Sequence, residues 1–309
     1  MSPLRVWAPH PERVEAVVGG ERRPMQAEDG GWWRLDEEIA PGTDYAFSLD
    51  GGEPLPDPRS PFQPEGVHGP SRTIDHDAFE WHDEGFRAPA RSSALVYELH
   101  VGTFSPEGTF DGVIGKLDHL AQLGVTHVEL MPVNELPGAR NWGYDGVDLF
   151  APNASYGGPD ALKRLVDECH RRGFAVLLDV VYNHLGPDGN YLERFAPYFT
   201  DRYHTPWGKA VNLDDRGSRE VRRFICDNAL MWLRDYHFDG LRIDAIHTFS
   251  DASAVHLLEQ MAEEAQALSA STGRPYQLIA ESDLNDPRVI RPPEVGGYGI
   301  DAQWSDDLH

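Results

Sequence analysis

The chain has 309 residues, 40% of them apolar, which is enough to bury a substantial core. It carries 27 basic and 51 acidic residues, a formal net charge of −24. A surface this negative repels phosphate backbones and anionic lipid, which argues against nucleic acid or a membrane as a partner. An uncharged polyol substrate is compatible with it.

The two cysteines do not indicate a disulfide or a metal site, and the N-terminus does not indicate a signal peptide. Cys169 and Cys226 lie in helix-like segments without CxxC spacing, so we expect each to be a small core residue. The opening Met-Ser-Pro-Leu-Arg-Val-Trp lacks the apolar run of a signal peptide, and no stretch approaches the length of a membrane span. We therefore expect a soluble cytoplasmic protein.

The first 55 residues alternate short strand-like runs with glycine-containing turns. This spacing predicts a small antiparallel β-sandwich of immunoglobulin-like type. The expected strands are 5–8, 14–18, 32–35 and 45–49. Residues 54–70 are rich in proline and glycine and are typical of a linker or an extended strap. Sandwich and linker together form an expected N-terminal domain at 1–90.

Beyond residue 90, apolar strand-like runs alternate with amphipathic helical stripes. The expected strands are 95–101, 125–133, 174–181, 240–244 and 277–281, with a sixth around 298–304. Strands that are apolar on both faces imply a parallel sheet covered by helices on both sides. A doubly wound sheet often has a glycine-rich phosphate loop after an early strand, and the sequence contains none.

Polar residues instead recur where the expected strands end. These residues are His100, Asn183, His184, Asp244 and Glu281. A (β/α)8 TIM barrel assembles its active site at the carboxyl ends of its strands. We therefore predict an incomplete TIM barrel at 91–309, with a short insert at about 185–217.

The third expected strand ends in Asp179-Val180-Val181-Tyr182-Asn183-His184. An aspartate inside such an apolar strand is costly unless it is hydrogen-bonded or paired with a cation. Asp179 is thus either a buried structural carboxylate or a support that orients neighbouring site residues. For His184, at the end of the strand, we favour a functional role.

The fourth and fifth strands end in two candidate catalytic acids. Arg242 and Asp244 are two residues apart, so they share one face of a strand, where the cation would keep Asp244 ionised as a nucleophile requires. Adjacent strands lie about 4.8 Å apart, which brings Asp244 and Glu281 near the roughly 5–5.5 Å separation of a retaining glycosidase. Their closeness would raise the pKa of one, leaving Glu281 protonated as general acid. The alternatives are a structural ion pair and two unrelated acids.

Aromatic residues are dense between the strands. Sugar rings pack on aromatic faces, so the set favours a carbohydrate, although loop packing is the better explanation for any single member. The set is Trp142, Tyr144, Tyr182, Tyr191, Tyr198, Phe199 and Trp207.

Three segments, DVVYNH, GLRIDAIH and AES, resemble in order and spacing the first three signature regions of the α-amylase clan, glycoside hydrolase family 13. The opening Val-Trp-Ala-Pro and the sandwich resemble the glucan-associated N-terminal domain of its branching and debranching members. More narrowly, the chain is similar to the maltooligosyltrehalose trehalohydrolases in DPRSPFQPEGVHGPS, YELHVGTFSPEGTF, RNWGYDGV, TPWGKAVNLD and DAQWSDDLH.

The resemblance implies that Asp244 is the nucleophile and Glu281 the proton donor. It also implies a set of residues that contact substrate: Tyr144, Asp179, Asn183, His184, Arg242, His247, Asp306, Asp307 and His309. The implied reaction is hydrolysis of the α-1,4 bond beside the terminal trehalose of maltooligosyltrehalose, after a maltooligosyltrehalose synthase has made that substrate. No cofactor is implied, and calcium is not expected because the insert at 185–217 is short.

One departure from the family pattern concerns a third carboxylate, which the family carries near the end of strand seven. No matching segment follows Glu281, and Asp307 lies only 307 − 281 = 26 residues further on, too soon for two more strand–helix units. We therefore expect this chain to be a fragment of a longer polypeptide. Two other functions stay open: a glycogen branching enzyme that uses the same acids, and a non-catalytic glucan-binding fragment.

Overall fold

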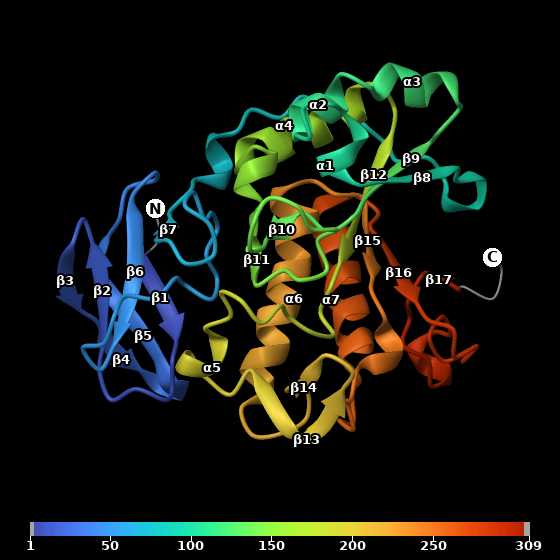
Figure 1. The fold of residues 1–309 in the computed structure, drawn as a ribbon. Coiled ribbons are helices and arrows are strands. Elements are labelled where there is room, and N and C mark those ends of the chain that lie inside the picture. Colours follow the sequence, from blue (N-terminus) through green and yellow to red (C-terminus); the bar gives the residue numbers. More distant parts are fainter. Residues whose placement is uncertain (1–2, 306–309) are drawn as a thin grey trace.

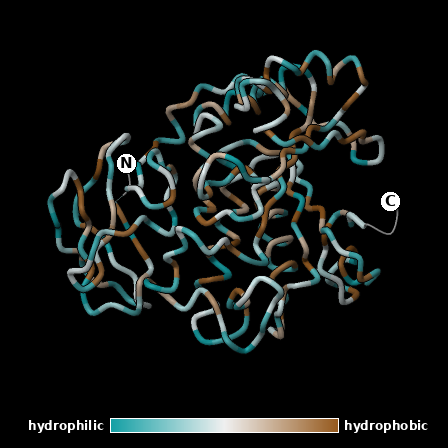
Figure 2. Tube along the Cα trace, in the orientation of Figure 1, coloured by the Kyte–Doolittle hydropathy of each residue, from teal (hydrophilic) through white to brown (hydrophobic). Residues whose placement is uncertain are grey.

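The computed structural model describes residues 3–305, and no helix in that range is long and apolar enough to cross a membrane. A part built only of strands lies beside a larger part of strands and helices (Figure 1). Hydrophobic residues gather along the inner strands and helices, and hydrophilic residues dominate the outer loops (Figure 2).

The N-terminal part consists of two antiparallel sheets, ordered β1-β5-β4 and β3-β2-β6-β7. The last strand, β7, comes after the proline-rich segment 54–70. The strands are β1 (Pro3–Trp7), β2 (Val14–Val18), β3 (Glu21–Pro24), β4 (Gln26–Glu28), β5 (Trp32–Glu38), β6 (Asp44–Leu49) and β7 (Ser71–Arg72). The sequence did not predict β3 and β4. Both are polar, largely exposed edge strands, so they lack the apolar alternation that marks a half-buried strand.

The proline-rich segment 54–70 is a packed strap. Leu55 forms an isolated bridge to Phe47 of β6. Ser60 and Gln63 are fully buried, and the Ser60 hydroxyl donates to Gln63 Oε1 at 2.7 Å. Arg59 pairs with Asp227 at 2.8 Å, which ties the strap to the larger part of the molecule.

The larger part contains one parallel sheet ordered β17-β16-β15-β12-β9-β8. Its strands are β8 (Val96–Leu99), β9 (His127–Leu130), β12 (Ala175–Val180), β15 (Gly240–Ile243), β16 (Gln277–Glu281) and β17 (Ala302–Trp304). Strands that follow one another in the chain are neighbours throughout, so the sheet never reverses its winding as a doubly wound sheet does. The sheet is a curled partial TIM barrel, and β17 is the expected sixth strand.

Helices connect the parallel strands (Figure 1). They are α1 (Val101–Phe104), α2 (Phe110–Ile114), α3 (Leu117–Gln122), α4 (Gly158–Arg171), α5 (Leu192–Phe195), α6 (Ser218–Asp235) and α7 (Leu257–Thr272). Helix α4 packs against β12 and α6 against β15, whereas α5 lies beside the N-terminal part. Two hairpins interrupt the alternation: β10 (Asn134–Glu135) with β11 (Asp148–Pro152), and β13 (Phe199–Thr205) with β14 (Gly208–Val211). Cys169 in α4 and Cys226 in α6 are buried free thiols, as expected.

A buried cluster of charged residues connects the segment before β8 to the last turn of α4 and to the loops that lead into β15 and β16. His170 contacts Asp83 Oδ2 at 2.8 Å through Nδ1 and Asp239 Oδ2 at 2.9 Å through Nε2. His237 and Arg274 each also reach Asp83 Oδ2 at 2.9 Å. Both nitrogens of His170 face carboxylates, so the imidazolium form satisfies them best.

Because of this cluster, we expect the free energy of unfolding to fall at alkaline pH. Burial alone would lower the pKa of His170, but its hydrogen bonds to Asp239 and Asp83 outweigh burial and raise it. The stabilisation is therefore complete below the unfolded pKa of about 6.5 and is lost as pH rises through the raised folded pKa. We expect the free energy of urea unfolding of His170→Asn to lose this part of the pH dependence above about pH 6.5, whereas the exchange of the exposed His119 on α3 for Asn keeps it. An unchanged pH slope in His170→Asn would contradict the prediction.

Candidate active site

Three neighbouring strands present the candidate catalytic residues at one end of the sheet. Asp179 in β12 is in register with Arg242 in β15, and Ile243 is in register with Ala280 in β16. Asp244 directly follows β15 and Glu281 is the last residue of β16. The two acids therefore lie at the same height on adjacent strands, as the sequence predicted.

The guanidinium of Arg242 joins the three acids. Its Nη1 lies 2.8 Å from Asp179 Oδ2 and 3.0 Å from Asp244 Oδ1, and its Nη2 lies 2.8 Å from Glu281 Oε1. Burial would lower the pKa of Arg242, but the surrounding acids, Asp179 and Glu281 foremost, raise it above its ordinary value. Arg242 therefore stays charged and offsets the repulsion among the carboxylates.

Asp244 and Glu281 each have a second contact that orients them. The Asn183 side-chain amide donates to Asp244 Oδ2 at 2.8 Å and to its carbonyl oxygen at 3.1 Å. The backbone N–H of Ala245 donates to Glu281 Oε2 at 2.7 Å. Ala245 has a φ of +44°, a left-handed conformation that costs energy for a residue with a side chain. This strained backbone turns one N–H from the Asp244 loop toward Glu281, a feature that no sequence pattern signals.

Asp179 is buried under Arg242 and Tyr144. The Tyr144 hydroxyl, from the loop between β10 and β11, donates to Asp179 Oδ2 at 2.8 Å. Burial raises the pKa of Asp179 to about 7, although the charge of Arg242 opposes this. Asp179 and Tyr144 thus both lie in the candidate site, as expected. They are hydrogen-bonded to each other, and Asp179 is also paired with Arg242.

His184 lies beside the same group of residues, and His247 lies at its rim. His184 Nδ1 contacts Asn183 Oδ1, and its ring stacks on Trp207 with centroids 4.6 Å apart and planes at 12°. Burial lowers the pKa of His184, which favours the neutral imidazole. His247 is about one-third exposed, and its Nδ1 lies 3.9 Å from Asp283.

Two groups of predicted residues are not placed in the site. Asp306, Asp307 and His309 lie outside the described residues. Tyr182 and Tyr198 are core residues, with 1% and 3% of their surfaces exposed. Sequence density could not separate these packing aromatics from the exposed ones, because it does not show which rings face the core.

Trp142 and Trp207 are the exposed members of the aromatic set, at 67% and 51%. Trp142 stacks on His100, at the end of β8, with centroids 5.8 Å apart. His100 itself contacts Asn141 O at 2.9 Å and the Tyr156 hydroxyl at 3.0 Å, so its ring is held by protein groups. The two tryptophans therefore offer the most exposed ring faces of the set to a sugar.

Glu129 in β9 is a site-adjacent acid that the sequence reading missed. It is fully buried, and neither carboxylate oxygen has a hydrogen-bond partner among residues 3–305. Burial raises the pKa of Glu129 to about 8, with Asp179 adding to the rise and Arg242 opposing it. An acid inside the apolar run His-Val-Glu-Leu is the same signal that drew attention to Asp179. No group of three or more His, Cys, Asp or Glu side chains among residues 3–305 is arranged to hold a metal ion.

Comparisons with known proteins agree with this fold. The family description "Alpha amylase, catalytic domain" matches residues 70–207. A malto-oligosyltrehalose trehalohydrolase from Rhizobium sp. (strain M-11) is 52% identical over 98% of this chain and 52% of its own length. A 1,4-alpha-glucan branching enzyme from Vibrio parahaemolyticus is 34% identical over 97% of this chain and 45% of its own length.

A solved structure from Salmonella typhimurium, provisionally named an alpha amylase, superposes with a TM-score of 0.92 at 41% identity. It is matched over 99% of this chain and 52% of that one. The chain therefore spans about half the length of the curated relatives it matches. The family match, the barrel topology and the identity to several relatives show that this chain has the alpha-amylase TIM-barrel fold and that, along almost its whole length, it is similar to malto-oligosyltrehalose trehalohydrolases.

Proposed function

We propose that this chain contributes to a retaining glycoside hydrolase that cleaves the α-1,4 bond next to the terminal trehalose of maltooligosyltrehalose, releasing trehalose. The observation that carries the proposal is one guanidinium, that of Arg242, bound to two acids at equal height on adjacent strands. A retaining mechanism needs two carboxylates this close, because one must reach the anomeric carbon while the other reaches the leaving oxygen. The relatives' names supply the substrate.

In the proposed mechanism Asp244 is the nucleophile and Glu281 the general acid. Glu281 protonates the glycosidic oxygen as that C–O bond breaks, and Asp244 Oδ1 or Oδ2 bonds to the anomeric carbon. Glu281 then removes a proton from water, whose oxygen displaces Asp244 from the anomeric carbon. Arg242 and Asn183 hold Asp244 in place, and the Ala245 N–H holds Glu281.

The remaining predicted residues have proposed supporting roles. Tyr144 would stack on the sugar at the cleavage point while its hydroxyl stays on Asp179, and His184 and His247 would contact sugar hydroxyls. The proposed substrate contacts of Asp306, Asp307 and His309 depend on residues that the structure does not describe. We also propose a cytoplasmic location, and a synthase that supplies the substrate.

Product analysis tests the reaction. The product of the complete reading frame, incubated with maltooligosyltrehalose, is expected to release free trehalose. Branched products from amylose without trehalose would instead favour the branching enzyme. The 309-residue chain is assayed in parallel: binding without cleavage, where the complete protein cleaves, supports the non-catalytic reading for this chain alone.

The stereochemistry of the cleaved bond is a second expected result. Two successive displacements at the anomeric carbon leave the new reducing end as the α-anomer. Proton NMR in the first minutes should therefore show the α-anomer signal of the shortened glucan before mutarotation adds the β signal. Early appearance of the β-anomer would show a single displacement and would contradict the roles given to Asp244 and Glu281.

A further inference from the structure

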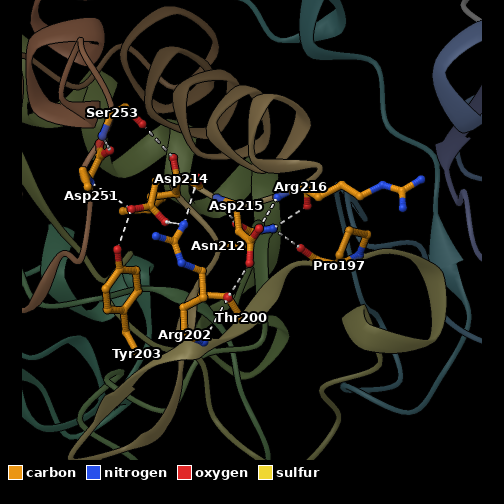
Figure 3. Close-up of polar contacts among 12 residues, drawn as sticks. Pro197, Thr200, Arg202, Tyr203, Asn212, Asp214, Asp215, Arg216, Asp251 and Ser253 are labelled. Carbon is orange, nitrogen blue, oxygen red and sulfur yellow. Dashed lines mark hydrogen bonds and ion pairs between the residues drawn. The ribbon is translucent and has the colours of Figure 1, made fainter.

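The hairpin β13–β14 contains a bulge on the strand that leads toward the candidate site. Its register shifts between Thr200 and His204, which leaves Arg202 and Tyr203 outside the regular ladder. A bulge bends a strand and re-aims its side chains. Figure 3 shows the side chains of both residues directed toward Asp214, in the segment that joins β14 to α6.

Asp214 receives contacts from both residues of the bulge. The Tyr203 hydroxyl donates to Asp214 Oδ2 at 2.7 Å, and Arg202 Nη1 lies 3.3 Å from Oδ1. Only 4% of the Asp214 side chain is exposed. A buried carboxylate with a cation and a hydroxyl donor holds the groups around it in one arrangement, because losing a donor leaves a charge unsatisfied.

Asp214 also binds the loop that follows the candidate nucleophile. Its Oδ2 accepts the backbone N–H of Ala252 at 2.9 Å. The neighbouring Asp251 pairs with Arg222 of α6 at 2.7 Å, and the Ser253 hydroxyl donates to Leu213 O at 3.3 Å. One carboxylate therefore connects the hairpin to the loop between Asp244 and α7.

The turn of the same hairpin reaches the candidate site. Trp207, four residues after Tyr203, stacks on His184, and His184 contacts Asn183. Asn183 in turn donates to Asp244. Trp207 is 51% exposed and is linked to Asp244 through His184 and Asn183.

We propose that Asp214 is a positioning residue: it fixes the bulge so that Trp207 stays stacked on His184 and presents its free face to the sugar substrate. Asp214 contacts none of the proposed reacting residues, so it acts through Trp207. It sets how tightly the substrate is held, and the chemical step depends on Asp244 and Glu281. The inference rests on the proposed function for its substrate and on the hairpin contacts for its geometry.

Steady-state kinetics with maltooligosyltrehalose test the effect on substrate. In the complete protein, Asp214→Asn is expected to raise KM about tenfold while kcat stays within about threefold, the pattern of lost uniform binding. Asp201→Asn is the matched control, because it removes an exposed carboxylate from the same bulge, 3.6 Å from Lys209. In a Trp207→Ala background, Asp214→Asn should add little, since both changes remove one interaction. An undiminished effect in that background, or a fall in kcat alone, overturns the proposal.

Fluorescence tests the geometry without any turnover. Stacking on His184 fixes the surroundings of the Trp207 indole and therefore its emission, and the Trp207 contribution is isolated by subtracting the spectrum of the matching Trp207→Phe protein. We expect that contribution to change, and its quenching by acrylamide to increase, in Asp214→Asn but not in Asp201→Asn. Tyr203→Phe, which removes one donor and keeps the ring, should shift it in the same direction if Asp214→Asn fails to fold. Unchanged Trp207 emission in Tyr203→Phe and in any folded Asp214→Asn overturns the proposal, whereas failure to cleave the sugar in every variant counts against the proposed function alone.

Discussion

Asp244→Asn is expected to lower kcat by about 10⁴-fold or more while leaving oligosaccharide binding within a few fold of the original. Asparagine keeps the size of the side chain and can still accept one hydrogen bond, but it cannot form the covalent bond to the anomeric carbon. Arg242 keeps its contacts with Asp179 and Glu281, so the site should stay assembled. Turnover is measured by trehalose release and binding by calorimetry, both on the complete protein.

The control for this prediction is a second ion-paired aspartate away from the site. Asp227 pairs with Arg59 at 2.8 Å and with Arg223 at 2.7 Å on α6. Asp227→Asn should keep normal turnover and show at most a modest fall in melting temperature, because partly exposed pairs contribute little. If Asp244→Asn instead lost fold and binding together, its pairing with Arg242 would be structural and the role of nucleophile would be wrong.

Glu129→Gln is expected to stabilise the protein at pH 8 and to leave it unchanged at pH 4. Burial raises the pKa of Glu129 from 4.5 to about 8, so the folded state holds a proton that the unfolded state releases in this range. For an acid with a raised folded pKa, stability falls as pH rises from about 4.5 to about 8 and then levels off. Glutamine is neutral at every pH, and Glu129 has no hydrogen bond for it to lose.

The size of this stabilisation follows from the difference between the folded and unfolded pKa values of Glu129. A shift of this width corresponds to an upper limit of roughly 5 kcal/mol, and we expect a gain of about 2–3 kcal/mol after local relaxation. Urea unfolding at pH 4, 6 and 8 measures it on the 309-residue chain. Glu98→Gln is the matched control, because Glu98 is the register partner of Glu129 on β8 but is exposed. A variant less stable than the original at pH 8 would mean that Glu129 is ionised and paired.

Local sequence patterns determined the architecture of this protein and the identity of its two principal acids. Apolar runs that alternate with amphipathic stripes specify strands and helices, and an unbroken βα succession places consecutive strands side by side. Since Asp244 and Glu281 each end such a run, their neighbourhood followed from position along the chain. The same reasoning applied to every acid inside an apolar run would also have identified Glu129.

The polar edge strands and the packing of the predicted strap were beyond these patterns. β3 and β4 are defined by the backbone of their partners and bury little, so their sequences carry no periodic signal. The strap is proline-rich like a flexible linker, and its burial depends on partners such as Phe47 and Asp227 elsewhere in the chain.

Tertiary structure alone decided how the site is held together. The spacing of Arg242 and Asp244 puts them on one face, but only the pairing register of three strands brings Asp179 and Glu281 to the same guanidinium. Ala245 keeps its left-handed backbone conformation because the surrounding fold holds it there. The stacking of Trp207 on His184 depends on the contacts that Asp214 makes with the hairpin. Sequence alone therefore identified residues whose role follows from their own strand, whereas contacts between distant segments required the fold, because long-range packing leaves no local pattern.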